Sequence, residues 1–190
     1  IHISTDYVFD GTLDRPYKES DQTNPLNIYG KSKLKGEQLA SEVLGDKLLI
    51  LRTAWLYSFH GPSFLKTITN LLFKKESINV VDNQFGSPTR TKSLAQAIYH
   101  SIDYGVQGIY HFTDLGDTSW FGFASAIREI LIERNPSVKI GQIHPVSSKD
   151  FPSKILRPRY TVLDKRKIRN HFKEDHIHWR DALEMEITYG

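Results

Sequence analysis

Short apolar runs alternate along the chain with longer segments in which apolar residues recur every three or four positions. The run over residues 47–52 (KLLILR) is almost continuously apolar, which is typical of a strand buried on both faces of a parallel sheet. The segment over residues 63–75 instead reads as an amphipathic helix, whose apolar stripe is formed by Phe64, Leu65, Ile68, Leu71 and Leu72. Strands that alternate with helices predict an α/β fold with a mostly parallel sheet.

Cap and turn residues set the ends of the predicted elements. Asn27 is suited to cap a helix over residues 28–44, and Gly45 is suited to end it. Thr118 is the expected cap of a helix over residues 119–134. The other predicted helices cover residues 63–75, 91–104, 164–171 and 178–187, and the predicted strands cover residues 1–4, 47–52, 78–81, 108–113 and 139–145.

A long segment between the first strand and the first helix, residues 6–27, reads as a polar loop. It contains Gly11, Pro16 and Pro25, which are turn-forming residues. Loops that follow the carboxyl ends of parallel strands are where α/β proteins place their binding and catalytic residues. We therefore expect a functional site around residues 4–7 and the start of the helix at residue 28.

Tyr29 and Lys33 stand four residues apart in the predicted helix, so they share one face. A nearby positive charge favours the phenolate form of a tyrosine, which makes a phenol a better proton donor at working pH. Such a pair can protonate the oxygen of a carbonyl group that is being reduced. Lys31 and Lys35 lack this spacing, and we interpret them as solvated helix lysines.

Several motifs occur in a fixed order and together resemble the extended short-chain dehydrogenase/reductase family. They are ISTDYVFDG, NPLNIYGKSKLKGE, LRTAWLY, DNQFGSPT and LRPRYTVLD, and they cover nearly the whole chain. The resemblance is closest to members that act in dTDP-L-rhamnose synthesis. It implies reduction by NADPH or NADH of the C4 ketone of a dTDP-linked 6-deoxyhexulose, and the dTDP-sugar would be the partner.

The resemblance also assigns roles to particular residues. Tyr29 would be the general acid, and Lys33 would act on Tyr29 and bind the nicotinamide ribose. Thr5 would hold the substrate oxygen or relay the proton, and it is preferred over Ser4 because alternation along a strand points the two to opposite faces. Ser4, Tyr29 and Lys33 are the expected cofactor-binding residues, and Thr5, Tyr29 and Lys33 the expected catalytic residues.

The substrate side of the expected site combines polar, aromatic and basic residues. Tyr7 would line the sugar pocket, and Asp6 would join it or serve as a turn residue. Trp55 follows the strand KLLILR at its carboxyl end, where it is either a flat surface for a sugar or base, or a core residue.

Two arginines are candidates for the diphosphate of a sugar nucleotide. Arg90 follows the loop GSPT and is equally well explained as a surface charge. Arg157 lies in the basic segment over residues 154–169 and is the better candidate, because a guanidinium matches phosphate oxygens with a bidentate fork.

The glycine-rich turn that binds a dinucleotide does not occur ahead of ISTDYVF in this chain. We therefore expect about 100 further residues upstream, since one βαβ unit takes roughly 30 residues or more. The chain would be the C-terminal portion of a Rossmann-like, doubly wound parallel sheet with a smaller α/β substrate-binding region. Residues 1–60 would complete the NAD(P)-binding domain, and residues 61–190 would be mainly substrate-binding, with some segments returning to the sheet. Activity of this chain alone is doubtful on that view.

Composition limits the classes of protein that need to be considered. The formal net charge of +3 does not indicate a nucleic-acid partner, and the absence of cysteine excludes disulfides and thiolate metal sites. No apolar run approaches the ~18 residues of a membrane span, so we expect a cytoplasmic protein without a membrane partner. The histidines lack metal-ligand spacing, so no metal site is predicted from the chain, whereas a requirement for Mg²⁺ and a homodimer are left open by the resemblance.

Two alternatives remain beside this reading. One is another extended-family enzyme, either an epimerase or a reductase of a different nucleotide sugar. The other is a non-catalytic protein, because the motifs also resemble the regulatory subunit of methionine adenosyltransferase. Thr5, Tyr29 and Lys33 in register favour catalysis.

Overall fold

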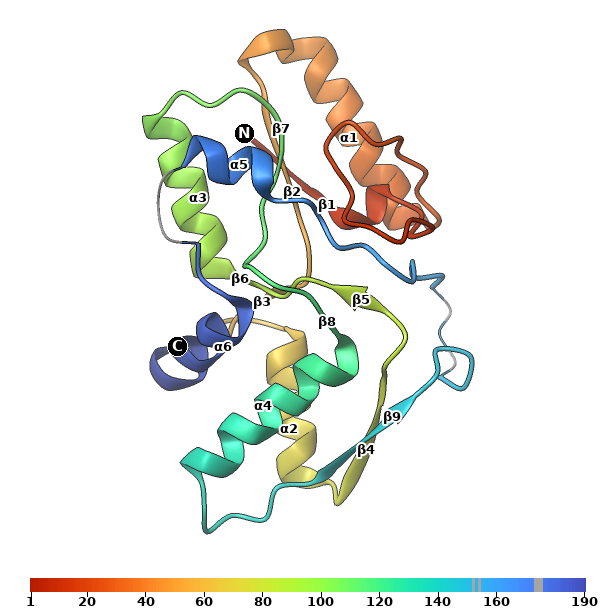
Figure 1. The fold of residues 1–190 in the computed structure, drawn as a ribbon, viewed down its shortest axis with the longest axis vertical. Helices are drawn as coiled ribbons and strands as arrows, with labels where there is room; N and C mark the ends of the chain where they lie inside the picture. Colours follow the sequence, from red (N-terminus) through yellow and green to blue (C-terminus); the bar gives the residue numbers. More distant parts are fainter. Residues whose placement is uncertain (152, 154, 173–175) are drawn as a thin grey trace.

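A parallel sheet in the order β1-β2-β7 forms the upper part of the molecule in Figure 1. The central strand β2 is buried along its whole length, as its apolar sequence predicts. Thr5 of β1 pairs with Thr53 of β2, so two hydroxyl side chains lie at the carboxyl ends of neighbouring strands. The strands cover His2–Thr5 (β1), Leu49–Thr53 (β2) and Gly108–His111 (β7). This computed structural model describes residues 1–151, 153, 155–172 and 176–190.

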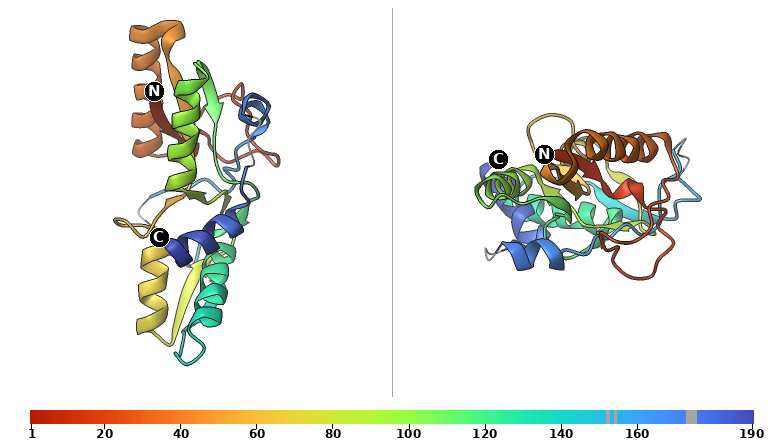
Figure 2. Two further views of the ribbon diagram at one scale, coloured as in Figure 1. Left: turned by 90° about the vertical axis from the view of Figure 1, so that its left-hand side faces the viewer. Right: turned by 90° about the horizontal axis from the view of Figure 1, so that it is seen from above.

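Helices cover both faces of this sheet. Figure 2 shows α1 (Ile28–Leu44) and α3 (Thr91–Asp103) side by side on one face, with α5 (Arg166–His171) on the other. The α1 helix packs against β1, and Lys33 Nζ of α1 donates to the Ile3 carbonyl of β1, so the strand end and the first turns of the helix lie together. Among the helices in the described part of the chain, none has the length and apolar character needed to cross a membrane.

The lower part of the molecule has its own small sheet and core. There β4 (Ser77–Val81) pairs in parallel with β9 (Gln142–Val146), and helices α2 (Phe64–Lys74) and α4 (Trp120–Arg134) pack against it. The last helix, α6 (Trp179–Tyr189), lies between the two parts (Figure 1). Apolar side chains from α2, α4 and α6 form one core cluster with those of β4.

Very short strands join the two parts. They pair in parallel between β3 and β6, and antiparallel between β5 and β8. The sequence did not predict them, because two residues are too few to give a periodic pattern. Their bounds are Leu56–Tyr57 (β3), Phe85–Gly86 (β5), Thr89–Arg90 (β6) and Thr118–Ser119 (β8), and two 3₁₀ turns cover Asp6–Val8 (η1) and Gly45–Lys47 (η2).

The helix ends test the predicted caps. The Asn27 side chain accepts a hydrogen bond from the Gly30 N–H, so the predicted cap of α1 is confirmed. The predicted cap of α4 is wrong: Ser119, and not Thr118, accepts from the Gly122 N–H at 3.0 Å. The predicted strands at 139–145 and 108–113 were also misplaced, since β9 begins later and β7 ends earlier.

The segment over residues 6–27 is more than a polar loop. Val8, Phe9 and Tyr17 in it are fully buried and pack with Leu163 from the far end of the chain. Its backbone is also tied to that segment, because the Tyr17 N–H donates to the Val162 carbonyl. This small core fixes the segment above the carboxyl end of β1.

The outer edge of β7 is covered by side chains. The Ile109 carbonyl accepts from Lys167 Nζ at 2.6 Å, and the His111 N–H donates to Glu19 Oε1 at 3.1 Å. An edge strand leaves such backbone groups free to pair with another chain unless something satisfies them. Here two charged side chains satisfy the Ile109 carbonyl and the His111 N–H.

A buried ion pair links α1 to β2. Glu37 accepts from Arg52 through both carboxylate oxygens, at 2.9 Å to Nε and 2.7 Å to Nη2. Each residue is only 3% exposed. The Arg52 guanidinium also lies over the Phe9 ring, with 5.3 Å between its carbon and the ring centroid. The pair therefore fixes the helix that carries Tyr29 to the centre of the sheet.

Candidate active site

A cavity of about 200 Å³ opens where β1 and β2 end and α1 begins. Ligands of open α/β sheets bind at this end of the strands. The structure brings most of the expected site residues together here. The cavity is lined by Ile3, Ser4, Thr5, Asp6, Tyr29, Lys33, Thr53, Ala54, Trp55 and Leu56.

The first turn of α1 presents Tyr29 to this cavity. The Asn27 cap starts the helix immediately before it, and Gly30 allows the backbone of Tyr7 to come close. A Cβ atom at Gly30 would lie 2.1 Å from the Tyr7 carbonyl oxygen, so a larger residue there would displace the loop. The rings of Tyr7 and Tyr29 meet edge to face with their centroids 6.1 Å apart. Tyr29 remains 55% exposed and lines the cavity, so it can meet a ligand there.

Lys33 lies one turn further along α1 and also faces the cavity. Its Nζ donates a short hydrogen bond of 2.5 Å to the Ile3 carbonyl on β1. That contact uses one of the three ammonium donors and holds the side chain over the strand end. Lys31 and Lys35 are exposed to solvent, which is consistent with their interpretation as solvated helix lysines.

Thr5 holds its hydroxyl in a defined orientation. Its Oγ1 donates to Asp6 Oδ1 at 3.0 Å and accepts from the Tyr7 N–H at 3.2 Å. Asp6 in turn accepts from the Thr161 hydroxyl through its other oxygen at 2.5 Å. Through these two bonds Asp6 links Thr5 to the segment around Thr161. Asp6 is only 3% exposed and also borders the cavity.

Burial raises the pKa of Asp6 to about 6, against the opposing effect of its hydrogen bonds from Thr161 and Thr5. The native carboxyl therefore keeps its proton to a higher pH than the unfolded one. Between pH ~4 and ~6 the native state binds more protons, so this group lowers stability as the pH rises through that window.

Replacing Asp6 with Asn is expected to remove this loss. We subtract the unfolding free energy of the unchanged protein from that of Asp6→Asn at each pH. This difference should increase by on the order of 3 kcal/mol from pH 4 to pH 7. Burial lowers the pKa of His111 to about 3, so this residue makes both proteins more stable as the pH rises. Because both proteins contain His111, its contribution cancels in the difference. Chemical denaturation at the two pH values measures it. If the difference in unfolding free energy is the same at pH 4 and pH 7, the pKa of Asp6 is not raised in the folded protein.

Ser4 and Thr53 add two hydroxyl groups to the cavity wall. Ser4 Oγ and Thr53 Oγ1 are buried and have no hydrogen-bond partner among the described residues. A buried hydroxyl without a partner is costly, and a ligand can supply the missing partner. With Lys33 and Tyr29 they form a set of donors and acceptors that fits the polar edge of a nicotinamide nucleotide. Sequence reasoning missed Thr53, although its place directly after the buried run was a usable signal.

Strand alternation does not separate Ser4 from Thr5 as expected. Both border the cavity, because β1 ends at Thr5 and the chain turns at once into η1. Thr5 is the residue that caps this turn. The preference for Thr5 over Ser4 therefore does not follow from opposite faces of the strand.

Trp55 forms the aromatic side of the cavity. It is half-buried and follows β2, as its place in the sequence predicts. One face of its indole is occupied by Trp120, whose ring lies parallel to it. A ligand can therefore use only the part of the indole that Trp120 leaves uncovered.

Tyr7 and Arg157 are not among the residues that line this cavity, but Tyr7 contacts Tyr29 and is influenced by the charge of Arg157. Burial, together with the Asp6 carboxylate, raises the pKa of Tyr7 to about 12, and the Arg157 charge acts in the opposite direction. The loop of Arg157 is attached to the start of α1, because Asn27 Nδ2 donates to the Leu156 carbonyl at 3.0 Å. Arg157 itself is exposed and available to an anion. Residue Lys154 of the same basic segment lies outside the described residues.

Arg90 lies apart from this group. Its Nε donates to Glu186 Oε2 at 2.6 Å in a partly buried pair, and its backbone N–H donates to Asp114 Oδ2 at 2.8 Å. It borders a different cavity of about 450 Å³ between α3 and α6, which contains neither Tyr29 nor Lys33. Because its charge is already paired, we do not retain the expectation that Arg90 binds the same diphosphate as Arg157.

The described residues give no support for metal binding. Among residues 1–151, 153, 155–172 and 176–190, no three or more His, Asp or Glu side chains form a group that could hold a metal ion. The open expectation of Mg²⁺ therefore receives no structural support from the described chain.

Comparison with known proteins shows clear similarity along the whole chain. The sequence pattern of the family described as "RmlD substrate binding domain" matches residues 1–189. The chain is 41% identical over 96% of its length to a dTDP-4-keto-6-deoxy-D-glucose reductase of Streptomyces niveus, and 36% identical over 96% to a dTDP-4-dehydrorhamnose reductase of Burkholderia thailandensis. It covers 62% and 65% of those proteins, which is less than two thirds of each.

A solved structure agrees in fold and in sequence. The dTDP-4-dehydrorhamnose reductase of Bacillus anthracis, determined in complex with NADP, matches with a TM-score of 0.90 and 36% identity. The match covers 100% of this chain and 65% of that one. The α/β fold with parallel strands expected from the sequence is thus confirmed as the fold of a dinucleotide-binding reductase.

Proposed function

The chain belongs to the family of the RmlD substrate-binding domain, and from this premise we propose that its protein reduces a dTDP-linked 4-keto sugar. The substrate would be dTDP-4-dehydro-L-rhamnose and the product dTDP-L-rhamnose, with NADPH or NADH as reductant. One observation carries the proposal: Thr5, Tyr29 and Lys33 border one cavity beside Trp55, at the carboxyl end of a parallel sheet. Those side chains are what carbonyl reduction needs from a protein.

Tyr29 would donate its phenolic proton to the C4 oxygen as the carbonyl becomes an alkoxide. A bound nicotinamide dinucleotide supplies the hydride to C4. Lys33, on the same face of α1, would stabilise the phenolate left on Tyr29, since opposite charges favour each other in a partly buried site. Thr5 would bind the same oxygen once its hydroxyl turns away from Asp6, and so would orient the carbonyl.

Within this chain, the cofactor would be bound by polar groups of α1 and the strand ends. Lys33 Nζ has donors left after its bond to Ile3, and these suit the hydroxyls of a ribose. Ser4 and Thr53 would supply hydrogen bonds to the nicotinamide, since their buried hydroxyls lack other partners among the described residues. The NADP in the Bacillus anthracis reductase supports NADPH as the first cofactor to test.

The sugar nucleotide would lie on the opposite side of the cavity. Trp55 would contact its apolar surface, Asp6 and Tyr7 would border the sugar, and Arg157 would meet the diphosphate. We assign residues 1–60 to the dinucleotide-binding part and residues 61–190 mainly to the substrate-binding part, with β7, α3 and α5 returning to the sheet. The cytoplasmic location and the homodimer stay predictions.

The proposal is tested by mixing the protein expressed from the full coding sequence with dTDP-4-dehydro-L-rhamnose and NADPH. Loss of NADPH absorbance and formation of dTDP-L-rhamnose are the expected results. A panel with other nucleotide-linked 4-keto sugars tests the alternative substrates, and NADH tests the cofactor. If none of them is reduced and the protein instead co-purifies with a synthetase, the non-catalytic reading is favoured.

Replacing Lys33 with Met is expected to weaken both cofactor binding and turnover. Methionine keeps much of the length of the side chain but loses the charge and the hydrogen bond to Ile3. A hydrogen bond to a charged group contributes about 1.5–3 kcal/mol, so the Kd for NADPH should rise roughly 10-fold or more. Fluorescence titration with NADPH and steady-state rates measure the two effects.

Lys35→Met is the matched control for this prediction, because Lys35 is an exposed lysine on the same helix. It should leave both quantities unchanged. Equal behaviour of the two variants would count against the role of Lys33.

A further inference from the structure

Trp55 has an unusual backbone conformation. Its φ angle is +48°, and among the described residues it is the one non-glycine residue with a positive φ. A bulky side chain in this region is strained, so it stays there only when the surroundings hold it. The surroundings of the Trp55 indole are therefore informative about its role.

The strand pair β5–β8 contacts the indole from two directions. Gly86 of β5 pairs with Thr118 of β8, and Trp120 follows β8 directly. The Trp120 ring stacks on the Trp55 ring with centroids 3.5 Å apart and an interplanar angle of 7°. A Cβ atom at Gly86 would lie 2.6 Å from Trp55 Nε1, so only glycine allows this approach. Gly86 and Trp120 thus form a clamp around Trp55.

The clamp is itself fixed to the lower core. Phe64 of α2 packs against the Trp120 ring, with centroids 4.6 Å apart, and stacks on Phe123 of α4 at 5.5 Å. Trp120 does not line the cavity that contains Tyr29, whereas Trp55 does. Of the stacked pair, Trp55 is therefore the member that a ligand in that cavity would meet.

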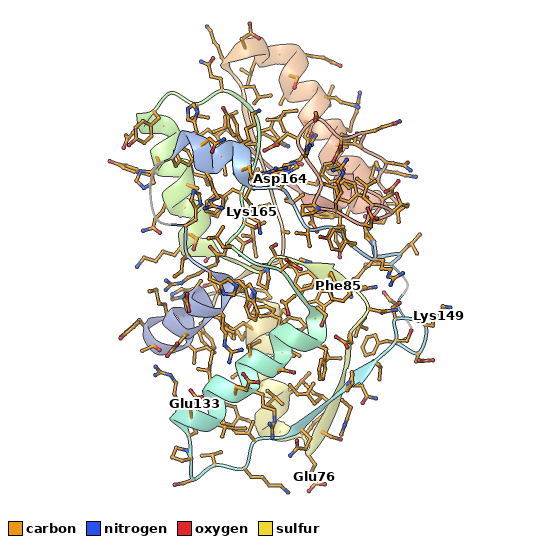
Figure 3. All side chains as sticks on the ribbon, viewed as in Figure 1. Glu76, Phe85, Glu133, Lys149, Asp164 and Lys165 are labelled. Atoms are coloured by element: carbon orange, nitrogen blue, oxygen red, sulfur yellow. The ribbon has the colours of Figure 1, made fainter. Side chains whose placement is uncertain are left out.

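Lys165 ties the loops on both sides of the clamp together. Its buried Nζ donates to Ser87 Oγ at 3.0 Å, to the Asp114 carbonyl at 3.1 Å and to the Gly116 carbonyl at 3.0 Å. Ser87 follows Gly86, and Gly116 precedes β8. In Figure 3, Lys165 lies above and to the left of Phe85 of β5.

We propose that Trp120 is a positioning residue that holds Trp55 in place for binding the sugar nucleotide. Trp120 belongs to α4 of the lower part, and Trp55 borders the cavity at the parallel sheet of the upper part. Through their stacking, the packing of α4 fixes where the Trp55 indole lies in the cavity. The inference rests on the proposed function for the identity of the ligand. The positioning of Trp55 can be tested without that ligand.

The first experiment follows Trp55 alone by fluorescence. The full-length protein is prepared with any tryptophan outside this chain also replaced by Phe, and Trp179→Phe removes the other tryptophan of the chain. In that background, Trp120→Phe and Trp120→Leu each leave Trp55 as the single emitter. We expect Trp120→Leu to lower the emission anisotropy of Trp55 and to increase its quenching by acrylamide. In Trp120→Phe a ring can still stack on the indole, so the anisotropy should stay high and the quenching low. Equal anisotropy and quenching in the two variants would overturn the proposal.

The second experiment separates substrate binding from chemistry. Trp120→Leu alone should raise the KM for the sugar nucleotide about 10-fold, with kcat changed less than about 3-fold and the Kd for NADPH unchanged. Trp120→Phe should restore most of the KM. A KM that stays within about 2-fold of the unchanged protein would show that Trp120 does not act on binding.

Trp179→Phe is the control for general damage to the core. Trp179 is 7% exposed and packs edge to face against Phe123 in the same cluster, but its ring does not stack on Trp55. It should lower stability without raising KM, and an equal rise in KM would overturn the proposal. If the unchanged protein reduces no nucleotide sugar at all, the proposed function fails, and the fluorescence result alone decides whether Trp120 positions Trp55.

Discussion

Turnover of the full-length protein is expected to fall by ~10²-fold or more when Tyr29 is replaced with Phe, because a positioned proton donor contributes at least that much. The change removes only the hydroxyl. The Phe ring can keep the edge-to-face contact with Tyr7, and the Asn27 cap of α1 is untouched. The unfolding free energy should therefore stay near its original value. The Kd for NADPH should rise by no more than about 10-fold, the scale of one neutral hydrogen bond. Steady-state rates with saturating NADPH measure the loss.

Tyr99→Phe is the control for the Tyr29 variant. Tyr99 is 63% exposed on α3 and lies outside the cavity at the strand ends. Its replacement should not affect turnover. If the Tyr29 variant keeps full activity, another group donates the proton, and the role assigned to Tyr29 is wrong.

The largest effect on stability is expected at Glu37. Replacing it with Gln leaves the Arg52 guanidinium buried without its counter-charge, and Arg52 Nη1 already lacks a partner among the described residues. Breaking one side of a buried ion pair costs about 3–5 kcal/mol, so Glu37→Gln should lower the unfolding free energy by on the order of 3 kcal/mol. Chemical denaturation monitored by circular dichroism measures this loss.

Glu42→Gln provides the comparison for the Glu37 variant. Glu42 is an exposed carboxylate on the same helix, so its loss should change stability by less than about 0.5 kcal/mol. Similar values for the two variants would mean that the pair with Arg52 contributes nothing specific. Because α1 carries Tyr29 and Lys33, a weakened attachment of α1 to β2 should also make the catalytic pair less ordered.

Local sequence signals were sufficient for the parts of the site that lie on one element. The spacing of Tyr29 and Lys33 placed them on one face of a helix, and the Asn27 cap fixed where that helix begins. The apolar run before Trp55 located the carboxyl end of a buried strand. Each of these features depends on residues within a few positions of one another.

Contacts between distant segments were not accessible in the same way. Asp6 receives a hydrogen bond from Thr161, and Arg90 is paired with Glu186, although nothing near either residue in the sequence marks its partner. The sequence also gives no local signal for the two-residue strands β5 and β8, because their pairing depends on how the two parts of the molecule come together. The stacking of Trp120 on Trp55 depends on that pairing, so it too appears only in the folded chain.

The covered edge of β7 limits how copies of this fold can join. An open-ended fibre needs a free strand edge on each side of the sheet, so that every added copy offers a new edge to the next. Lys167 and Glu19 occupy two outward-facing backbone groups of β7, the Ile109 carbonyl and the His111 N–H. A strand of another copy could form a regular ladder on this edge only after displacing both side chains. Two charged side chains thus act against open-ended growth through the β7 edge.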